Sequence, residues 1–131
     1  MRIVGVKHRG RVITAPPGRA VRPTADRVRE SVFNILSHGF GNEAPTIDGA
    51  RVLDGFAGTG AMGLEALSRG AGHITFMDID IGPCRSNAKA LDELARCEFI
   101  NTNCFIPPPA PVSSDLVFIA PPYREMRALS A

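Results

Sequence analysis

The 131-residue sequence predicts an α/β fold with a doubly wound parallel sheet. From residue 51 onward, short apolar segments alternate with segments of helical periodicity, which is the order typical of β-α-β units. A glycine-rich turn at residues 55–60 lies between the first apolar segment and the helix that follows it. The 44% apolar and 21% charged content is that of a globular protein, and no apolar run approaches the roughly 18 residues of a membrane span.

Charge divides the chain into two parts. Residues 1–30 carry eight Lys and Arg against two Asp and Glu, whereas residues 31–131 carry seven against eleven. The net charge of +2 therefore conceals a basic head on an acidic body. A basic head favours a polyanionic partner, because clustered cations release counterions from phosphates, and a solvated surface arm is the alternative. The N-terminus lacks an apolar signal segment, and the three cysteines are odd in number and form no CxxC pair, which favours a cytoplasmic protein with reduced thiols over disulfide or zinc use.

The N-terminal residues predict a hairpin followed by a helix. Apolar residues alternate loosely over residues 2–15, with His8-Arg9-Gly10 between the two halves. Pro16-Pro17-Gly18 ends this segment, and Thr24 is a suitable N-cap for a helix. Apolar residues then recur at helical spacing, so we expect the helix to extend to about His38.

The remaining elements follow in regular order. We expect strands at residues 51–54, 74–77, 99–100 and 116–119, and helices at residues 61–68 and from 82 to about 96. Four prolines between residues 107 and 111 predict an extended loop, because proline neither continues a helix nor pairs in a central strand. This order predicts a basic hairpin-and-helix extension at residues 1–45 and a sheet domain at residues 46–131.

The glycine-rich turn is the strongest candidate for a ligand site. Gly58, Gly60 and Gly63 satisfy the pattern G-x-G-x-x-G between a strand and a helix, where glycine lets the backbone approach a ligand closely. Asp78 follows Gly58 by 20 residues, at the end of the second strand, where its carboxylate can accept hydrogen bonds from both hydroxyls of a ribose. The pattern predicts a nucleoside site, with a purely structural turn as the alternative.

Asp54 distinguishes between the cofactors that carry adenosine. Its carboxylate ends the first strand directly before the glycines, where it favours a cationic amino-acid tail and repels a pyrophosphate. The residues therefore favour S-adenosylmethionine over a dinucleotide. A nicotinamide (NAD)-binding domain is the weaker alternative, based on the three glycines and Asp78.

A second motif, Ala120-Pro121-Pro122-Tyr123, follows the last strand. A Pro-Pro-aromatic sequence at this place forms a rigid rim at the carboxyl edge of the sheet, although alone it is more often a loop termination. The Tyr123 ring can stack on a nucleobase, and the carbonyl before the prolines can accept a hydrogen bond from an exocyclic amine. Methyl transfer to that amine would then depend mainly on orientation, with the base turned out of its stack.

Together these motifs resemble the bacterial 16S rRNA guanine-N2 methyltransferases of the RsmD type. The resemblance covers nearly the whole chain, through Arg2-Ile3-Val4-Gly5, Arg9-Gly10-Arg11, residues 22–30 and residues 63–70. It implies a Rossmann-like class I S-adenosylmethionine-dependent methyltransferase sheet of strand order 3-2-1-4-5-7-6, preceded by an N-terminal β-hairpin and helix. This chain would supply strands 3-2-1-4.

The resemblance also implies roles for particular residues. The cofactor would be bordered by Asp54, Phe56, Ala57, Gly58, Thr59, Gly60, Asp78, Asn103 and Cys104. The catalytic segment would be Ala120, Pro121, Pro122 and Tyr123. The phosphates of 16S rRNA in an assembling small ribosomal subunit would be contacted by Arg9, Arg11, Arg22, Arg27 and Arg29. Arg27 is also spaced for an ordinary helix-surface pair with Glu30, and neither a metal nor a membrane is expected.

The sequence departs from the family pattern at two places. The family's fourth motif is Asp or Asn followed by Pro-Pro-aromatic, and Ala120 keeps the carbonyl but lacks the side-chain acceptor for the target amine. Loss of a positioned group of this kind lowers a rate roughly 10²–10⁴-fold. The chain ends at Ala131, so we expect a C-terminally truncated domain. Its strand at residues 116–119 would then be a bare edge of the sheet, which favours self-association. The family itself is expected to be monomeric. A non-catalytic remnant that binds S-adenosylmethionine or RNA is therefore the second function.

Overall fold

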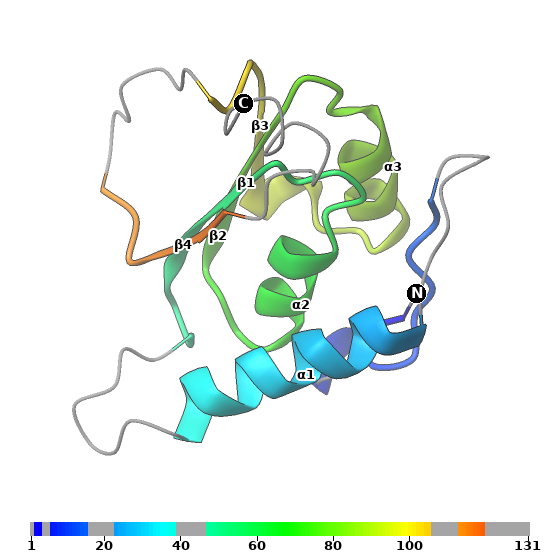
Figure 1. The fold of residues 1–131 in the computed structure, drawn as a ribbon, viewed down its shortest axis with the longest axis vertical. Helices are drawn as coiled ribbons and strands as arrows, with labels where there is room; N and C mark the ends of the chain where they lie inside the picture. Colours follow the sequence, from blue (N-terminus) through cyan, green and yellow to red (C-terminus); the bar gives the residue numbers. More distant parts are fainter. Residues whose placement is uncertain (1, 4–5, 16–22, 39–46, 106–112, 120–131) are drawn as a thin grey trace, which may run out of the picture.

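The computed structural model describes residues 2–3, 6–15, 23–38, 47–105 and 113–119 (Figure 1). Its helical elements are η1 (Val6–His8), α1 (Pro23–His38), α2 (Ala61–Ser68), α3 (Gly82–Ala90) and η3 (Leu94–Arg96), where η denotes a 3-10 helix. Its strands are β1 (Arg51–Gly55), β2 (His73–Asp78), β3 (Cys97–Asn101) and β4 (Leu116–Ile119). The expected order of strands and helices is confirmed, and β3 extends two residues before and one residue after the expected 99–100.

The four strands form one parallel sheet in the order β3-β2-β1-β4. This is the order that the family resemblance implies for the first four strands. In the register of the sheet, Asp54 of β1 lies opposite Phe76 of β2 and Phe118 of β4, and Asp78 lies opposite Asn101 of β3. Because all strands run the same way, the segments that follow β1, β2 and β3 meet at one edge of the sheet.

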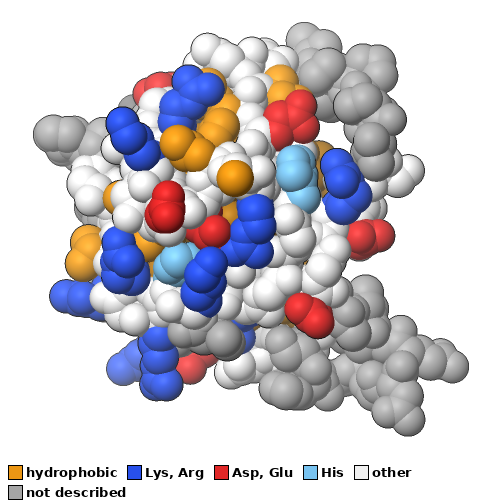
Figure 2. Space-filling model, turned by 180° about the vertical axis from the view of Figure 1, so that it is seen from behind, with side chains coloured by type: hydrophobic (Ala, Val, Ile, Leu, Met, Phe, Trp, Pro, Cys, Tyr) orange, Lys and Arg blue, Asp and Glu red, His pale blue; other side chains and the backbone are white. Residues whose placement is uncertain are grey.

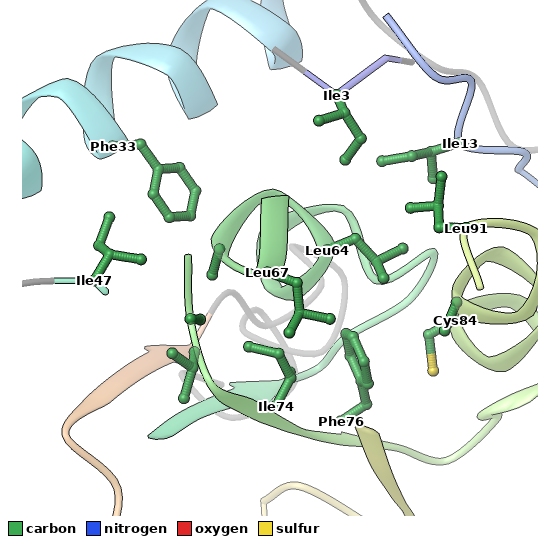
Figure 3. Close-up of a cluster of buried hydrophobic side chains, with 14 of the residues drawn as sticks. Ile3, Ile13, Phe33, Ile47, Leu64, Leu67, Ile74, Phe76, Cys84 and Leu91 are labelled. Carbon is green, nitrogen blue, oxygen red and sulfur yellow. The ribbon is translucent and has the colours of Figure 1, made fainter. Parts of the chain in front are cut away.

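Helix α2 is the central element of the core. Figure 3 shows α2 between α1 and the sheet, with Leu64 and Leu67 close to Ile74 and Phe76 of β2. All residues from Gly63 to Ser68 are buried, because α1 covers the side of the helix that faces away from the sheet. A helix in this position has to be apolar on most of its surface, as its sequence is.

The close contact between α2 and the sheet requires glycine at position 63. A Cβ atom on Gly63 would lie 2.5 Å from Cε1 of Phe76 and 2.8 Å from Cγ2 of Ile74, much nearer than such atoms approach. The glycine therefore places the first turn of α2 directly against β2. This sets the position of the glycine-rich turn relative to the end of that strand.

The N-terminal residues share the core of the sheet domain. The expected antiparallel pairing of residues 2–15 is present, but in the part described it is reduced to one bridge between Arg2 and Val12, with η1 in the intervening turn. Ile3 and Ile13 are each 1% exposed and belong to the same apolar cluster as Leu64. The described part of this segment is therefore packed against the body and is not a loose surface arm.

The expectation of one helix from residue 82 to about 96 is wrong. Helix α3 ends at Ala90, and Asp92 adopts a left-handed conformation with φ +57°. The chain then turns Glu93 inward, where its carboxylate lies 3.0 Å from Nε2 of His8 and pairs with Arg96. Leu94, in η3, is 41% exposed as a result.

Strand β4 lies at one edge of the sheet as far as the structure describes it. Its side chains alternate in exposure, and Val117 and Ile119 are 46% and 66% exposed. Self-association through this edge stays a prediction. Among the residues that the structure describes, no helix has the length and apolarity to cross a membrane.

Candidate functional site

The expected cofactor residues meet at the carboxyl edge of the sheet. Asp54 comes from β1, Asp78 from β2, and Asn103 and Cys104 from the segment after β3. Backbone hydrogen bonds hold these segments together, from Thr102 N to the Asp78 carbonyl at 2.9 Å and from Ala57 N to the Met77 carbonyl at 3.0 Å. The structure thus brings together residues that lie up to 50 positions apart in the sequence, from Asp54 to Cys104.

The turn between β1 and α2 uses three left-handed residues. Phe56 and Gly58 have φ +56°, and Gly60 has φ +83°. A Cβ atom on Gly60 would lie 2.9 Å from the Cβ of Cys84, so this glycine lets α3 approach the turn. A Cβ atom on Gly58 would meet nothing within 4 Å. The turn is therefore packed against the protein at Gly60 and open at Gly58, where a ligand can approach the backbone.

Asp54, on β1, carries a buried carboxyl group that contacts the first turn of α2. Its side chain is 3% exposed, and Oδ2 accepts a hydrogen bond from Gly63 N at 3.0 Å. Burial, together with the smaller effect of the charge of Asp78, raises the pKa of Asp54 to about 7 against the lowering effect of the Gly63 hydrogen bond. A cation beside this group would favour its ionised form.

Asp78 holds the glycine-rich turn in place. Its Oδ2 accepts a hydrogen bond from Gly58 N at 2.9 Å, and its Oδ1 accepts one from Asp80 N at 3.0 Å. Each carboxylate oxygen has two lone pairs, so Asp78 keeps the capacity to accept further hydrogen bonds from a ribose. The half-buried position of the side chain leaves it accessible at the edge of the sheet.

This arrangement does not suit a pyrophosphate. Gly58 N is committed to Asp78, Gly60 N to the Ala57 carbonyl at 2.8 Å, and Gly63 N to Asp54. A dinucleotide site uses such backbone N–H groups to bind phosphate oxygens. Here they bind protein acceptors, two of which are carboxylates, so the NAD alternative lacks support in the geometry.

Two apolar side chains beside the site were missed by sequence reasoning. The ring of Phe105 contacts the ring of Phe56 edge to face, with centroids 4.8 Å apart. Ile79, which directly follows Asp78, is 65% exposed. The sequence did offer a signal for Ile79, since it is an apolar residue between two acids in Asp78-Ile79-Asp80. Both side chains offer apolar surface for a flat ring.

The segment after β3 is held by contacts to the glycine-rich turn and within the segment itself. Cys104 Sγ accepts a hydrogen bond from Phe56 N at 3.4 Å, and burial raises the pKa of this thiol above its ordinary value. Asn103 is exposed, and its Oδ1 accepts a hydrogen bond from Phe105 N at 3.0 Å. No group of three or more metal-ligating side chains occurs in the part of the chain that the structure describes.

The arginines expected to contact RNA fall into different environments. Arg9, Arg11 and Arg27 are exposed, whereas Arg29 is 3% exposed and donates from Nε to Glu65 Oε1 at 3.1 Å. The expectation for Arg29 is therefore wrong, since its guanidinium is consumed by a buried carboxylate and by the Arg2 carbonyl. Arg22 and the motif at residues 120–123 lie outside the described residues.

Further cations lie beside the exposed arginines. Arg11 donates a hydrogen bond to the Ala90 carbonyl at 2.8 Å, which places it at the end of α3. Helix α3 itself carries Arg85 and Lys89, both exposed, and no acidic residue. Figure 2 shows Lys and Arg side chains gathered over the part of the surface formed by the N-terminal segment and α3. The basic character that the sequence assigns to residues 1–30 thus continues onto the sheet domain.

Comparison with known proteins identifies the family. A family model described as conserved hypothetical protein 95 matches residues 1–131. The chain belongs to this family. It is 39% identical to ribosomal RNA small subunit methyltransferase D of Escherichia coli K12 over 95% of this chain and 61% of that protein. A Bacillus subtilis protein provisionally named as an rRNA methyltransferase is 35% identical over 97% of this chain and 69% of its own length.

Solved structures give the same result for the fold. A Haemophilus influenzae structure provisionally assigned as a methylase is 31% identical, with a TM-score of 0.67 over 98% of this chain and 70% of that chain. An Escherichia coli structure provisionally assigned as a methyltransferase is 42% identical, with a TM-score of 0.62 over 79% of this chain and 54% of that chain. The sheet is thus the Rossmann-like sheet of the methyltransferases, as the resemblance implied. The chain spans about two thirds of the length of the curated relatives it matches.

Proposed function

We propose that this protein is an S-adenosylmethionine-dependent methyltransferase that acts on the N2 amine of a guanine in 16S rRNA. The observation that carries the proposal is the pair of carboxylates, Asp54 and Asp78, on either side of an open glycine turn at the carboxyl edge of a methyltransferase sheet. The names of its relatives support an rRNA substrate. Guanine N2 as the acceptor rests on the family resemblance.

The described residues fit the proposed cofactor. Asp54 would face its cationic methionine part, Asp78 would accept hydrogen bonds from its ribose, and residues 103–104 would lie near its adenine. The turn over residues 56–60 would border the methionine part. When bound, S-adenosylmethionine supplies a methyl group on an electrophilic sulfonium. The fit rests on charge, because both acids favour a cation where a phosphate would be repelled.

The basic surface would hold the RNA backbone. Arg9, Arg11 and Arg27 would contact phosphates together with Arg22, and the exposed Arg85 and Lys89 extend this surface onto α3. Phosphate contacts of this kind position a nucleic acid without reading its sequence. An assembling small ribosomal subunit in the cytoplasm is the proposed partner.

The motif at residues 120–123 would present the target base. Tyr123 would stack on the guanine, and the Ala120 carbonyl would accept a hydrogen bond from its N2 amine. Ala120 supplies no side-chain acceptor, so turnover is expected to be slow while cofactor binding is kept. This residue also favours the second function, a protein that binds cofactor or RNA without turnover.

Calorimetry and methyl-transfer assays test the proposal. Titration with S-adenosylmethionine is expected to give a binding isotherm, and titration with NAD is expected to give none. Labelled methyl transfer to small subunits or 16S rRNA that lack the mark then measures turnover. Binding without transfer would favour the second function, and no heat with S-adenosylmethionine would exclude both.

A further inference from the structure

One buried amide joins the N-terminal segment to the glycine-rich turn. Asn87, on α3, is 4% exposed. Its Oδ1 accepts a hydrogen bond from Thr14 N at 2.9 Å, and its Nδ2 donates to the Thr14 carbonyl at 2.9 Å. The same Nδ2 donates to the Thr59 carbonyl at 3.0 Å. A single side chain thus binds both backbone groups of Thr14 and one backbone group of the turn.

The two segments that Asn87 connects have different proposed roles. Thr59 lies in the turn that borders the methionine part of the cofactor. Thr14 lies in the segment that carries Arg9 and Arg11, the exposed arginines proposed to contact RNA. Thr14 is 73 residues from Asn87 in sequence, so the contact is a product of the fold and not of local chain geometry.

The contact is specific for an amide. A side chain at this position has to accept from one N–H group and donate to two carbonyls, and asparagine has both functions on a short stem. An alanine would remove the hydrogen-bonding groups that Asn87, itself 4% exposed, offers to these three backbone groups. Aspartate would offer only acceptors to two carbonyl oxygens.

We propose that Asn87 is a positioning residue that couples cofactor binding to the N-terminal RNA-binding segment; this inference rests on the proposed function. The turn contains left-handed residues at positions 56, 58 and 60 and is open at Gly58, so a bound cofactor restricts its conformations. Through the Thr59 carbonyl and Asn87, this restriction extends to Thr14. The cofactor thereby pre-orders the segment that meets RNA, and the two ligands bind with positive cooperativity.

Hydrogen exchange measures this coupling without RNA. Deuterium uptake of a peptide covering residues 11–15 is followed in the full chain, with and without S-adenosylhomocysteine, which binds as the non-reacting product. In the wild-type protein, the ligand is expected to slow uptake in this peptide. In Asn87→Ala it is expected to slow uptake at residues 56–60 only. Ser86→Ala, an exposed neighbour on the same helix, is the matched control and is expected to behave as wild type.

Equilibrium binding supplies a second readout. In wild type, S-adenosylhomocysteine is expected to tighten the binding of unmethylated 16S rRNA at least about fivefold, the lower end of typical coupling. In Asn87→Ala this factor is expected to approach one. Where alanine loses the fold, Asn87→Ser keeps a hydroxyl at the position and carries the same comparison. A residue with a structural role only would weaken both ligands and leave the factor unchanged.

The outcomes separate the coupling from the proposed function. If wild type fails to bind S-adenosylhomocysteine, the proposed function is wrong. If it binds this ligand while uptake at residues 11–15 is unaffected, the coupling through Asn87 is wrong and the proposed function stands. An unchanged coupling factor in a folded Asn87 variant also overturns the coupling.

Discussion

The Nε of Arg29 lies 3.1 Å from Oε1 of Glu65, and both side chains are buried. This ion pair joins α1 to α2 in the interior of the protein, and Arg69 holds the second oxygen of the same carboxylate at 2.9 Å. An arginine of the basic N-terminal segment therefore serves the fold. Its guanidinium is not at the surface that RNA would meet.

Replacing Arg29 is expected to destabilise the protein. Arg29→Met removes one of the cations that hold the buried Glu65 carboxylate, while Arg69 stays, at a cost of about 3 kcal/mol in the free energy of unfolding. Arg9→Gln, at an exposed position, is expected to change that free energy by less than about 0.5 kcal/mol. Urea denaturation of both variants measures the difference. Equal effects of the two substitutions would contradict the structural role of Arg29.

The exposed cations are expected to show in the salt dependence of RNA binding. Arg9→Gln and Lys89→Gln each remove a proposed phosphate contact, which lowers the slope of log K against log salt by about 0.7–0.9. Arg51→Gln is the control, because Arg51 is exposed at the start of β1, at the opposite end of the strand from the glycine-rich turn. Filter binding of 16S rRNA between low and moderate salt gives the slopes. A reduced slope for Arg51→Gln alone would place the RNA on another face.

Asp54 predicts a pH-dependent affinity for the cofactor. The pKa of its carboxyl group is about 7 in the free protein, and a cationic ligand binds the ionised form. The affinity is therefore expected to rise with pH up to about 7, by as much as tenfold per unit. Calorimetric titration with S-adenosylmethionine from pH 5.5 to 8 measures this dependence. Asp54→Asn is expected to bind more weakly and to lose the pH dependence.

The same group affects the stability of the ligand-free protein in the opposite direction. The folded-state pKa is raised, so between its ordinary value of 3.8 and about 7 the folded protein holds a proton that the unfolded chain has lost. The contribution of the Asp54 carboxyl group to the free energy of unfolding is therefore present at low pH and is lost as the pH rises through about 7. Asp54→Asn is expected to remove this slope in urea denaturation. A slope that persists in the variant would assign it to another group.

Two glycines of the G-x-G-x-x-G pattern are expected to differ in effect. In Gly63→Ala the new methyl group meets Phe76 and Ile74, and overpacking of this kind costs about 1–3 kcal/mol. In Gly58→Ala the methyl group meets no atom, and the φ of +56° costs about 1–2 kcal/mol. We expect Gly58→Ala to weaken cofactor binding more than it weakens the fold. Thermal unfolding measures the effect of both variants on the fold, and calorimetry measures their affinity for S-adenosylmethionine. Wild-type affinity in Gly58→Ala would contradict the expectation.

The sequence predicts those features that depend on local pattern. The alternation of strands and helices predicted a doubly wound parallel sheet, and the strand order within it followed from the family resemblance. The glycine pattern located the turn, because a left-handed backbone leaves a mark in the residue type. The residue types do not reveal the end of α3, because aspartate, the left-handed residue at position 92, also occurs in helices. The contact that turns Glu93 inward is made with His8, which lies 85 residues away in the sequence.

Long-range polar contacts account for most of what the sequence did not predict. Arg29 has the same chemistry as Arg9, and only the fold places one against Glu65 and the other in solvent. Asn87 gave no signal because its partners are backbone groups, which every residue has. Composition predicts that charge will gather, and packing decides which of those charges remain at the surface.

Ala120 predicts a gain of activity on substitution. The family's motif has Asp or Asn at this position, and either side chain would accept a hydrogen bond from the target amine, which orients the amine and favours its lone pair as nucleophile. Ala120→Asp and Ala120→Asn are therefore expected to raise the rate of methyl transfer, within the roughly 10²–10⁴-fold range of a positioned group. The initial rate of labelled methyl incorporation into unmethylated small subunits measures the gain. Ala120→Leu, which offers no acceptor, is the control, and the Kd for S-adenosylmethionine is expected to stay unchanged in all three variants. Equal rates for Ala120→Asn and Ala120→Leu would show that the side-chain acceptor does not limit the reaction.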